Sequence, residues 1–294
     1  MSPAARVPAD RIVLKCDERR ETVLELIRSA RTRLTLSLFR CTDKKFFAAL
    51  KAAVDRGVQV DVLMTPRAKG GRKKLQRMWD RLEATGATIA SYNDPVVKYH
   101  AKYMVVDDGP ALIASLNFTR KCFTRTSDAI LLTYDPAVVS SLRAVMAADR
   151  DGRPLPEGLT DRLILGPERA RRQFTALIEG ATTSVQVLDP KLSDPGILSL
   201  LNARREAGVR VEVFDGGYVG AQKSHGKMLL VDGRQAVIGS MALTALCLDF
   251  RREVAVAVTD PAAVSVIREW FGTINAAMGA PPGAATSTAG GATC

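Results

Sequence analysis

A duplicated block of sequence most constrains how this chain can fold. The segment LIRSARTRLTLSLF resembles LIEGATTSVQVLDP, and AAVDRGVQVDVLM resembles NARREAGVRVEVF. Leu26 aligns with Leu177 and Gly57 aligns with Gly208, with the same offset of 151 residues in each case. A repeat this long is a supersecondary unit rather than a solenoid repeat, so we expect two related units in one fold.

Each copy of the block reads as a helix, a strand, a second helix and a second strand. In the first copy, a helix around Leu26 precedes an alternating strand over residues 34–39, a helix over 45–55 that Gly57 ends, and a strand over 58–64. Two strands joined through a helix form a βαβ unit, for which a right-handed crossover is expected.

Both copies then continue into a β-hairpin. Strands over 103–107 and 111–115 flank an Asp-Asp-Gly-Pro turn, and strands over 228–232 and 236–239 flank Asp-Gly-Arg. Helices therefore alternate with both parallel and antiparallel strands. The sequence predicts an α/β fold of two duplicated α/β/α units, each with a mixed sheet.

The two units are expected to differ in length. The first takes residues 1–155 and carries a basic insertion over 66–98, and the second takes residues 156–275. The boundary falls at the end of the polar stretch DRDGRPLP, which contains both proline and glycine. Residues 276–294 carry no charge and little that could be buried, so we expect a disordered tail.

The only two histidines of the chain occupy the same sequence context. Each is followed by lysine two residues later and by aspartate seven residues later, in the pattern HxKxxxxD. Chance would give both motifs with a probability on the order of 10⁻⁵, so we reject two unrelated core histidines. The six motif residues are His100, Lys102, Asp107, His225, Lys227 and Asp232.

Residues of these types can cleave a phosphodiester. Histidine and lysine two residues apart on a strand project from one face, so both can reach the same phosphate. A neutral imidazole can attack phosphorus, and a protonated imidazole opposite it can deliver a proton to the leaving alkoxide. Lys102 and Lys227 would neutralise the non-bridging oxygens, and the hydroxyls of Ser115 and Ser240 would add hydrogen bonds.

We expect no metal and no other cofactor. Histidine and carboxylate side chains can also form a tetrahedral metal site, but here a lysine ammonium would stand beside each histidine and repel a cation. The five cysteines form no CxxC or CxxH pair, so a structural zinc site is not expected either.

The paired motif resembles the signature of the phospholipase D superfamily, a duplicated HxKxxxxD followed by a Gly-Ser-x-Asn type of segment. The resemblance covers the chain from about residue 12 to residue 275. It implies two α/β/α phospholipase D-like units that meet about a pseudo-twofold axis, each giving one histidine and one lysine to a single site. It also implies metal-independent phosphodiester cleavage through a phosphohistidine intermediate.

The resemblance also suggests roles for individual residues. By analogy with members whose first histidine is the nucleophile, His100 is expected to attack and His225 to act as general acid. A carboxylate that accepts from Nδ1 fixes an imidazole's tautomer and stabilises the imidazolium. Asp128 and Glu253, each 28 residues after its histidine, match the acid that follows the family's motif.

The two motif aspartates have a second interpretation. Asp107 and Asp232 stand at the end of a strand, directly before a hairpin turn. Aspartate is common at such positions because its side chain caps local backbone amides. We therefore count both as motif residues with either a catalytic or a structural role.

The segments after the two motifs depart from the family pattern in different ways. The first copy keeps Asn117 but has Ala114 where glycine is usual, and the second keeps Gly239 but has Ala242 in place of the asparagine. One half has therefore lost an amide. This departure is the reason to consider a non-catalytic, polyanion-binding relic as an alternative.

The insertion begins with six cations within eleven residues and no acid, among which Arg72, Lys73 and Lys74 are candidate substrate-binding residues. A solvated basic loop is the alternative interpretation. The residues that follow place Leu75, Met78, Trp79 and Leu82 on one helical face. That helix either packs against the sheet or lies in a membrane interface.

Charge and composition narrow the substrate class. Lys and Arg total 42 against 31 Asp and Glu, giving a net charge of +11, which favours an anionic partner. Aromatic residues are 5% of the chain and are not interleaved with the basic cluster, which tilts the choice toward lipid. We therefore expect phospholipase D-type hydrolysis or phosphatidyl transfer, with a nonspecific, EDTA-resistant nuclease on DNA or RNA as the alternative.

The sequence also suggests where the protein works. No apolar run approaches the roughly 20 residues of a membrane-spanning helix, and no secretory signal is recognised at the N-terminus. A cytoplasmic protein that contacts membranes peripherally is expected. Because the duplication supplies both half-sites, the active site should be complete in a monomer.

Overall fold

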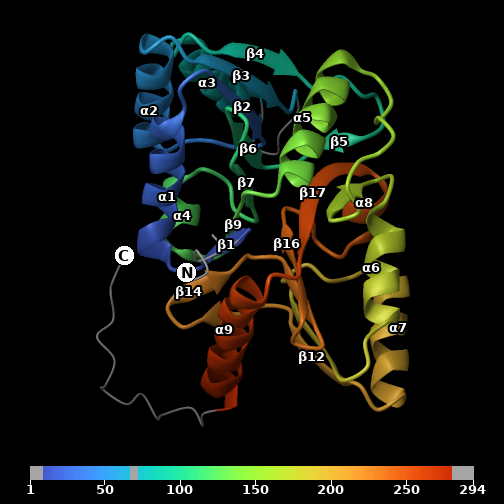
Figure 1. The fold of residues 1–294 in the computed structure, drawn as a ribbon. Helices are drawn as coiled ribbons and strands as arrows, with labels where there is room; N and C mark the ends of the chain where they lie inside the picture. The colour runs from blue at the N-terminus through green and yellow to red at the C-terminus, as the bar shows by residue number, and fades with distance from the viewer. Residues whose placement is uncertain (1–8, 67–71, 280–294) are drawn as a thin grey trace, which may run out of the picture.

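The computed structural model describes residues 9–66 and 72–279, which form two mixed β-sheets and the helices that cover them (Figure 1). The first sheet has the strand order β1 (Asp10–Val13), β9 (Ile130–Thr133), β7 (Ala111–Ala114), β6 (Tyr103–Val106), β2 (Arg33–Leu38), β3 (Gln59–Met64) and β4 (Thr88–Ser91). Strands β2, β3 and β4 are parallel to one another, and the other pairings are antiparallel.

The second sheet repeats this order with the equivalent strands. It runs through β10 (Leu163–Gly166), β17 (Arg251–Val258), β16 (Gln235–Gly239), β15 (Met228–Val231), β11 (Ser184–Leu188) and β12 (Arg210–Phe214). Here β11 and β12 are parallel, and the other pairs along this order are antiparallel. The predicted α/β fold of two duplicated units with mixed sheets is confirmed.

The helices form layers outside and between the sheets. Helices α1 (Cys16–Ser29), α2 (Lys44–Asp55) and α3 (Arg72–Glu83) cover the outer face of the first sheet, and α6 (Ala170–Glu179) and α7 (Pro195–Glu206) cover that of the second. Helices α5 (Pro136–Asp151) and α9 (Pro261–Gly279) contribute to a core shared by both sheets. The short helices α4 (Arg120–Thr124) and α8 (Ala245–Asp249) follow the two hairpins.

Alternating side chains divide each hairpin between two cores. Tyr103 and Val105 of β6 enter the core between the sheets, whereas Met104 and Val106 pack under α1 and α2. Such period-two alternation is what a strand buried on both faces requires. Because residues of both sheets share the central core, the two units form one body.

Two short strands, β5 and β14, cross between the units. Strand β5 (Lys98–Tyr99) of the first unit pairs in parallel with the start of β17 in the second. Strand β14 (Gln222–Ser224) of the second unit pairs in parallel with β8 (Thr126–Ser127) of the first, and β13 (Tyr218–Val219) pairs with β14. Each crossing strand leads directly into one of the two histidines.

The structure adds detail to the predictions for the insertion and for the tail. Met78 and Leu82 are buried, and Leu75 and Trp79 pack against the same core, so the apolar face of α3 is used in packing against the first sheet. Helix α9 continues to Gly279, past the expected start of the tail at residue 276. The remainder of that tail lies outside the described residues.

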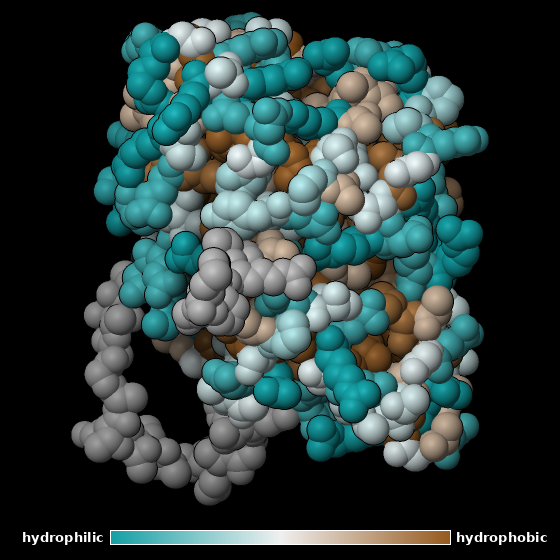
Figure 2. All heavy atoms as spheres, viewed as in Figure 1, coloured by the Kyte–Doolittle hydropathy of each residue, from teal (hydrophilic) through white to brown (hydrophobic). Residues whose placement is uncertain are grey.

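The surface is mainly polar on the face in view. Hydrophobic residues appear there as small separate patches between hydrophilic ones (Figure 2). Among the helices of the described residues, none combines the length and the hydropathy needed to cross a membrane.

Candidate active site

His100 is held between the two units. It follows β5, its backbone amide donates to the carbonyl of Arg252 at 2.9 Å, and its Nδ1 lies 2.7 Å from Oε1 of Glu253. The Glu253 carboxylate is 0% exposed, and 14% of the His100 side chain is exposed. The ring of Phe39, which follows β2, contacts the imidazole edge-on at 4.3 Å between centroids.

His225 has the equivalent environment with the units exchanged. Its Nδ1 lies 2.8 Å from Oδ1 and 3.1 Å from Oδ2 of Asp128, which is 0% exposed. The His225 side chain is 29% exposed. A buried carboxylate on Nδ1 places the proton there and leaves Nε2 with a free lone pair toward the ligand.

Each histidine is therefore paired with the acid of the opposite unit. The crossing strands explain why: β5 aligns Arg251 and Arg252 beside the residues before His100, which puts Glu253 next to that histidine. In the same way, β14 aligns Thr126 and Ser127 beside the residues before His225. The sequence identified both acids. It could not show that each acid serves the histidine of the other unit, because this depends on strand pairing between the units.

The two motif serines hydrogen-bond to the buried acids that orient the histidines. Ser115 donates to Oδ1 of Asp128 at 2.8 Å, and Ser240 donates to Oε2 of Glu253. Both serines are buried and also accept backbone amides, at 2.9 Å and 3.2 Å. Both hydroxyls orient the buried carboxylates, and direct binding of phosphate by the serines stays a prediction.

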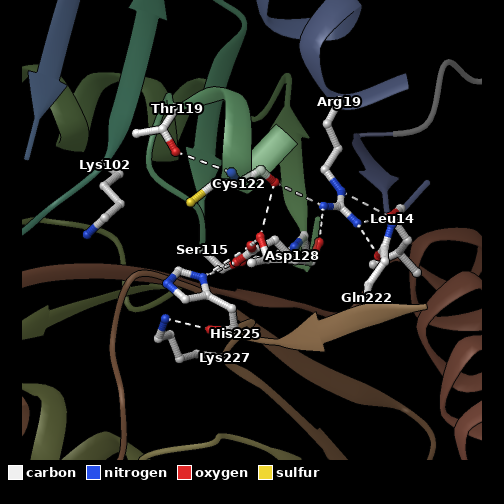
Figure 3. A network of polar contacts seen from close by, with 12 residues as sticks. Leu14, Arg19, Lys102, Ser115, Thr119, Cys122, Asp128, Gln222, His225 and Lys227 are labelled. Atoms are coloured by element: carbon white, nitrogen blue, oxygen red, sulfur yellow. Dashed lines mark hydrogen bonds and ion pairs between the residues drawn. The ribbon is translucent and has the colours of Figure 1, made fainter. Parts of the chain in front are cut away.

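The lysines lie with the histidines. Lys102 Nζ is 3.1 Å from Nδ1 and 3.2 Å from Nε2 of His100, and it donates to that residue's carbonyl at 2.5 Å. Lys227 donates to the His225 carbonyl at 2.7 Å. In Figure 3 both lysine amino groups lie on the open side of the His225 ring, and Asp128 lies on the other side. The histidine and lysine side chains of the two motifs therefore lie at one site.

Burial changes the titration of the first pair. It lowers the pKa of His100 to about 4, and the charges of Lys102 and Lys227 add to the effect while Glu253 opposes it. Burial also lowers the pKa of Lys102 to about 7, against the attraction of Glu253 and with repulsion from Lys227. At neutral pH the His100 imidazole is therefore uncharged.

The two acids are ionised although they are buried. Burial alone would raise the pKa of Asp128, but hydrogen bonding to His225 and the charge of His225 lower it below its ordinary value. The pKa of Glu253 is lowered in the same way, by the charge and the hydrogen bond of His100 against the effect of burial. Each histidine therefore has a fixed negative charge behind it.

The motif aspartates lie at the turns. Asp107 accepts from the backbone amides of Arg31, Thr32 and Arg33, and these bonds lower its pKa to about 2 against the effect of burial. Asp232 does the same for residues 182–184, and its pKa also lies well below the ordinary value. Both aspartates have positive φ, at 43° and 52°. They lock each hairpin turn to the start of the neighbouring strand.

The segments after the two motifs have different surroundings in the two units. A Cβ on Gly239 would lie 2.3 Å from the Val254 carbonyl oxygen, so this position requires glycine. Ala114 is buried without such a restriction in the first unit. Asn117 is half-buried and its Oδ1 has no hydrogen-bond partner, whereas the equivalent Ala242 is fully buried.

Arg19 is a positioning residue that the sequence did not reveal. It is 1% exposed and donates to the carbonyl oxygen of Thr126 at 2.5 Å and to Oε1 of Gln222 at 3.1 Å (Figure 3). It therefore ties β8 to β14 beside Asp128. Burial lowers the pKa of Arg19, and the charge of Asp128 opposes this. Helical periodicity places position 19 on the buried face of α1, and this is the only feature of the sequence that could have pointed to Arg19.

In the described part of the chain, the candidate substrate-binding residues Lys73 and Lys74 do not contact the histidines. Lys73 and Lys74 are exposed on the first turn of α3, and no contact of the described residues joins them to either motif. Arg72 begins the same helix. The helix is nevertheless near the site edge of the sheet, because Sδ of Met78 accepts from the amide of Cys41 at 3.0 Å, two residues after Phe39.

One group of described residues has donor atoms arranged for a metal. Sulfur, oxygen and nitrogen donors of Cys122, Asp128 and His225 all lie within 4.8 Å of one another. The positive charge of Lys227 acts on Asp128, which disfavours a cation there. Nδ1 of His225 is already hydrogen-bonded to Asp128.

Two histidine–acid pairs and two lysines meet at the junction of the duplicated α/β units. A site of this kind belongs to the class of enzymes that transfer phosphodiester groups. The family model described as "Cardiolipin synthase, PLD-like domain" matches residues 23–150 and 183–274, which is more than half of the chain. The chain therefore belongs to this family of phospholipase D-superfamily enzymes.

Two curated proteins are similar in sequence to this chain over part of their length. Cardiolipin synthase A of Pseudomonas entomophila is 31% identical over 129 residues, which are 44% of this chain and 27% of that protein. Cardiolipin synthase A of a Pseudomonas putida strain is 30% identical over 127 residues, 43% of this chain and 26% of that protein. The matched region thus spans about a quarter of these relatives.

Solved structures share the fold. A polyphosphate kinase from Porphyromonas gingivalis superposes with a TM-score of 0.74 at 20% identity, covering 92% of this chain and 47% of that one. A phosphatidylserine synthase from Haemophilus influenzae gives a TM-score of 0.68 at 13% identity, covering 91% of this chain and 86% of that one. At such identities the likeness concerns the fold.

Proposed function

We propose that this chain cleaves phosphodiesters through a covalent adduct on His100, with phospholipids as substrates, by phospholipase D-type hydrolysis or phosphatidyl transfer. The observation that carries the proposal is the crossed pairing of each imidazole Nδ1 with a buried carboxylate of the other unit, at 2.7 and 2.8 Å. This arrangement presents two Nε2 atoms and two ammonium groups to one ligand.

The first step transfers the phosphatidyl group to the enzyme. Nε2 of neutral His100 attacks phosphorus, the bond to the leaving oxygen breaks, and protonated His225 gives its Nε2 proton to that oxygen. Lys102 and Lys227 stabilise the charge on the non-bridging oxygens. In the second step His225 takes a proton from water or an alcohol, whose oxygen attacks phosphorus and releases His100.

Assignment of His100 as the nucleophile rests on its environment. Burial lowers its pKa to about 4, so it is neutral and able to attack at physiological pH. The more exposed His225 is better placed to exchange protons with an incoming water or alcohol. Asp107 and Asp232, which cap backbone amides, take a structural role in this mechanism.

Support for lipid substrates comes from the family and its named relatives. Both curated relatives reported above are cardiolipin synthases, although the chain matches only part of them. We place the protein in the cytoplasm, in peripheral contact with membranes, and regard the active site as complete in a monomer because both half-sites belong to one chain. A nuclease is the second candidate, favoured by the net charge of +11.

The test measures phosphodiester cleavage in excess EDTA by wild type and His100→Ala. The substrates are mixed phosphatidylglycerol/phosphatidylcholine liposomes and single- and double-stranded nucleic acid. Lipid turnover that disappears in the variant is the expected result. Cleavage of nucleic acid alone would favour the nuclease, and no turnover of any substrate by wild type would favour the polyanion-binding relic.

A further inference from the structure

The exposed faces of α4 and α8 break the symmetry of the site. An offset of 125 residues aligns His100 with His225 and also aligns the two helices. Their buried positions agree in kind, with Cys122 matching Cys247 and Phe123 matching Leu248. All three pairs of exposed positions differ, and they are Arg120 and Ala245, Lys121 and Leu246, and Arg125 and Phe250.

Both helices flank the catalytic groups. The thiol of Cys122 on α4 lies within 4.8 Å of the donor atoms of Asp128 and His225. On α8, Cys247 accepts a hydrogen bond from Arg251 and acts electrostatically on Lys102. The cationic helix thus belongs to the His225 side of the site, and the apolar helix belongs to the His100 side.

Neighbouring segments extend the contrast. On the α8 side, Leu246 is 40% exposed, Phe250 is 50% exposed, and Val96 is 65% exposed. Val96 stands two residues before Lys98, whose amide donates to the Phe250 carbonyl at 3.0 Å. These three residues, Val96, Leu246 and Phe250, form what we call the apolar rim.

The cationic side is extended in the corresponding way. The amide of Lys223 donates to the Arg125 carbonyl at 3.1 Å, so this lysine adds a fourth cation to Arg120, Lys121 and Arg125. These four residues form the cationic rim. Tyr218, the strand partner of Lys223, is exposed beside it.

We propose that the two rims orient an amphipathic substrate, with acyl chains against the apolar rim and an anionic headgroup against the cationic rim. This inference rests on the proposed function and adds the substrate class: a phospholipid whose headgroup carries net negative charge. Apolar contact and charge complementarity favour this orientation over its reverse.

The orientation agrees with the proposed direction of attack. The general acid His225 stands on the side of the cationic rim, so the headgroup alcohol departs on that side, where uncharged glycerol is accepted and the quaternary ammonium of choline would be repelled. The phosphatidyl group kept on His100 would remain beside the apolar rim. A nucleic-acid backbone would gain from the cationic rim but not from the apolar rim.

The experiment measures binding separately from turnover. In the His100→Ala background, calorimetry gives the affinities of monomeric dihexanoyl phosphatidylglycerol and dihexanoyl phosphatidylcholine. Arg120→Ala/Lys121→Leu/Arg125→Phe converts α4 to the α8 pattern, and Leu246→Ser/Phe250→Ser makes the apolar rim polar. A matched control, Lys51→Ala/Arg172→Ala/Arg205→Ala, removes the same charge from exposed positions of α2, α6 and α7.

The proposal predicts that the two variants change lipid binding in different ways. The α4 variant should lose at least about tenfold in preference for phosphatidylglycerol over phosphatidylcholine. The α8 variant should weaken both lipids by about tenfold and leave their ratio unchanged. An unchanged ratio in the α4 variant, or an equal loss in the control, would overturn the proposal. Absence of turnover by wild type would instead count against the proposed function, because binding is measured independently of it.

Discussion

Oε1 of Glu253 lies 2.7 Å from Nδ1 of His100, although 153 residues separate the two along the chain. The same relation holds between Asp128 and His225. Neither unit can therefore orient its own histidine, and the catalytic site exists only when the two units are docked. This dependence explains why strands cross between the units beside both histidines.

The crossed pairing predicts which variants act together. Glu253→Gln should lower the rate of adduct formation by about 10²- to 10⁴-fold, because the imidazole of His100 loses its fixed tautomer and its charge partner. Added to His100→Ala, the same substitution should cause little further loss. Steady-state and rapid-quench rates of the single and double variants check this. Independent, additive effects of Glu253 and His100 would contradict the pairing.

The pH dependence follows from the lowered pKa values of His100 and Lys102. kcat/KM should stay high down to about pH 4, where His100 becomes protonated, and should fall above about pH 7, where Lys102 loses its charge. Lys102→Arg keeps the charge and should move the alkaline limb to higher pH. An alkaline limb unmoved by this substitution would exclude Lys102 as its source.

Folding stability should depend on pH through the same residues. Between pH 4 and about 6.5 the unfolded chain binds a proton at His100 that the folded chain does not, so the free energy of unfolding should fall as the pH is lowered through this window. Urea denaturation across the window measures the slope. His100→Asn should reduce it, and an unchanged slope would contradict the burial effect.

The motif aspartates should affect stability more than chemistry. Asp107→Asn removes the charge that accepts three backbone amides, and it should cost about 1–3 kcal/mol of unfolding free energy. Because Asp107 caps a turn, kcat at a temperature well below unfolding should remain within a few-fold of wild type. Thermal unfolding and kcat measured on the same sample separate the two roles. A large loss of kcat in a stably folded variant would restore a catalytic role.

A buried ion pair between the units should be critical for stability. Arg252 is 5% exposed and bonds to Asp149 of the first unit at 2.9 Å and to Glu168 of the second. Arg252→Ala would leave a buried carboxylate uncompensated and should cost about 3–5 kcal/mol. Lys51→Ala, which breaks the exposed pair with Asp55, is the control and should cost under about 0.5 kcal/mol. Similar losses in chemical denaturation of the two variants would contradict this account.

Much of the fold and the site could be predicted from the sequence because the signals are local or repeated. Alternation located β2, hairpin turns located strands such as β6 and β15, the repeat revealed the duplication, and identical spacing identified both acids. What could not be predicted depends on contacts between distant segments. The exchange of Glu253 and Asp128 between the units, and the clamp by Arg19, both need the docked structure.

The serines show the same limit within a single motif. Their spacing correctly placed Ser115 and Ser240 near the histidines, but it did not show that each hydroxyl donates to a buried carboxylate. Spacing along a chain gives proximity, whereas the direction of a hydroxyl depends on which acceptor is buried beside it. Lys73 and Lys74 show a different limit of sequence analysis. A dense run of positive charge does not reveal how far it lies from the site.

The most direct test of the central claim is to locate the covalent intermediate. Enzyme mixed with a short-chain phosphatidylglycerol in excess EDTA is quenched in alkali within milliseconds, and its peptides are analysed by mass spectrometry. The account predicts a phosphatidyl adduct on the peptide that contains His100, absent in His100→Ala and slower to form in Glu253→Gln. An adduct on the His225 peptide, or rapid turnover with no adduct on either histidine, would contradict it.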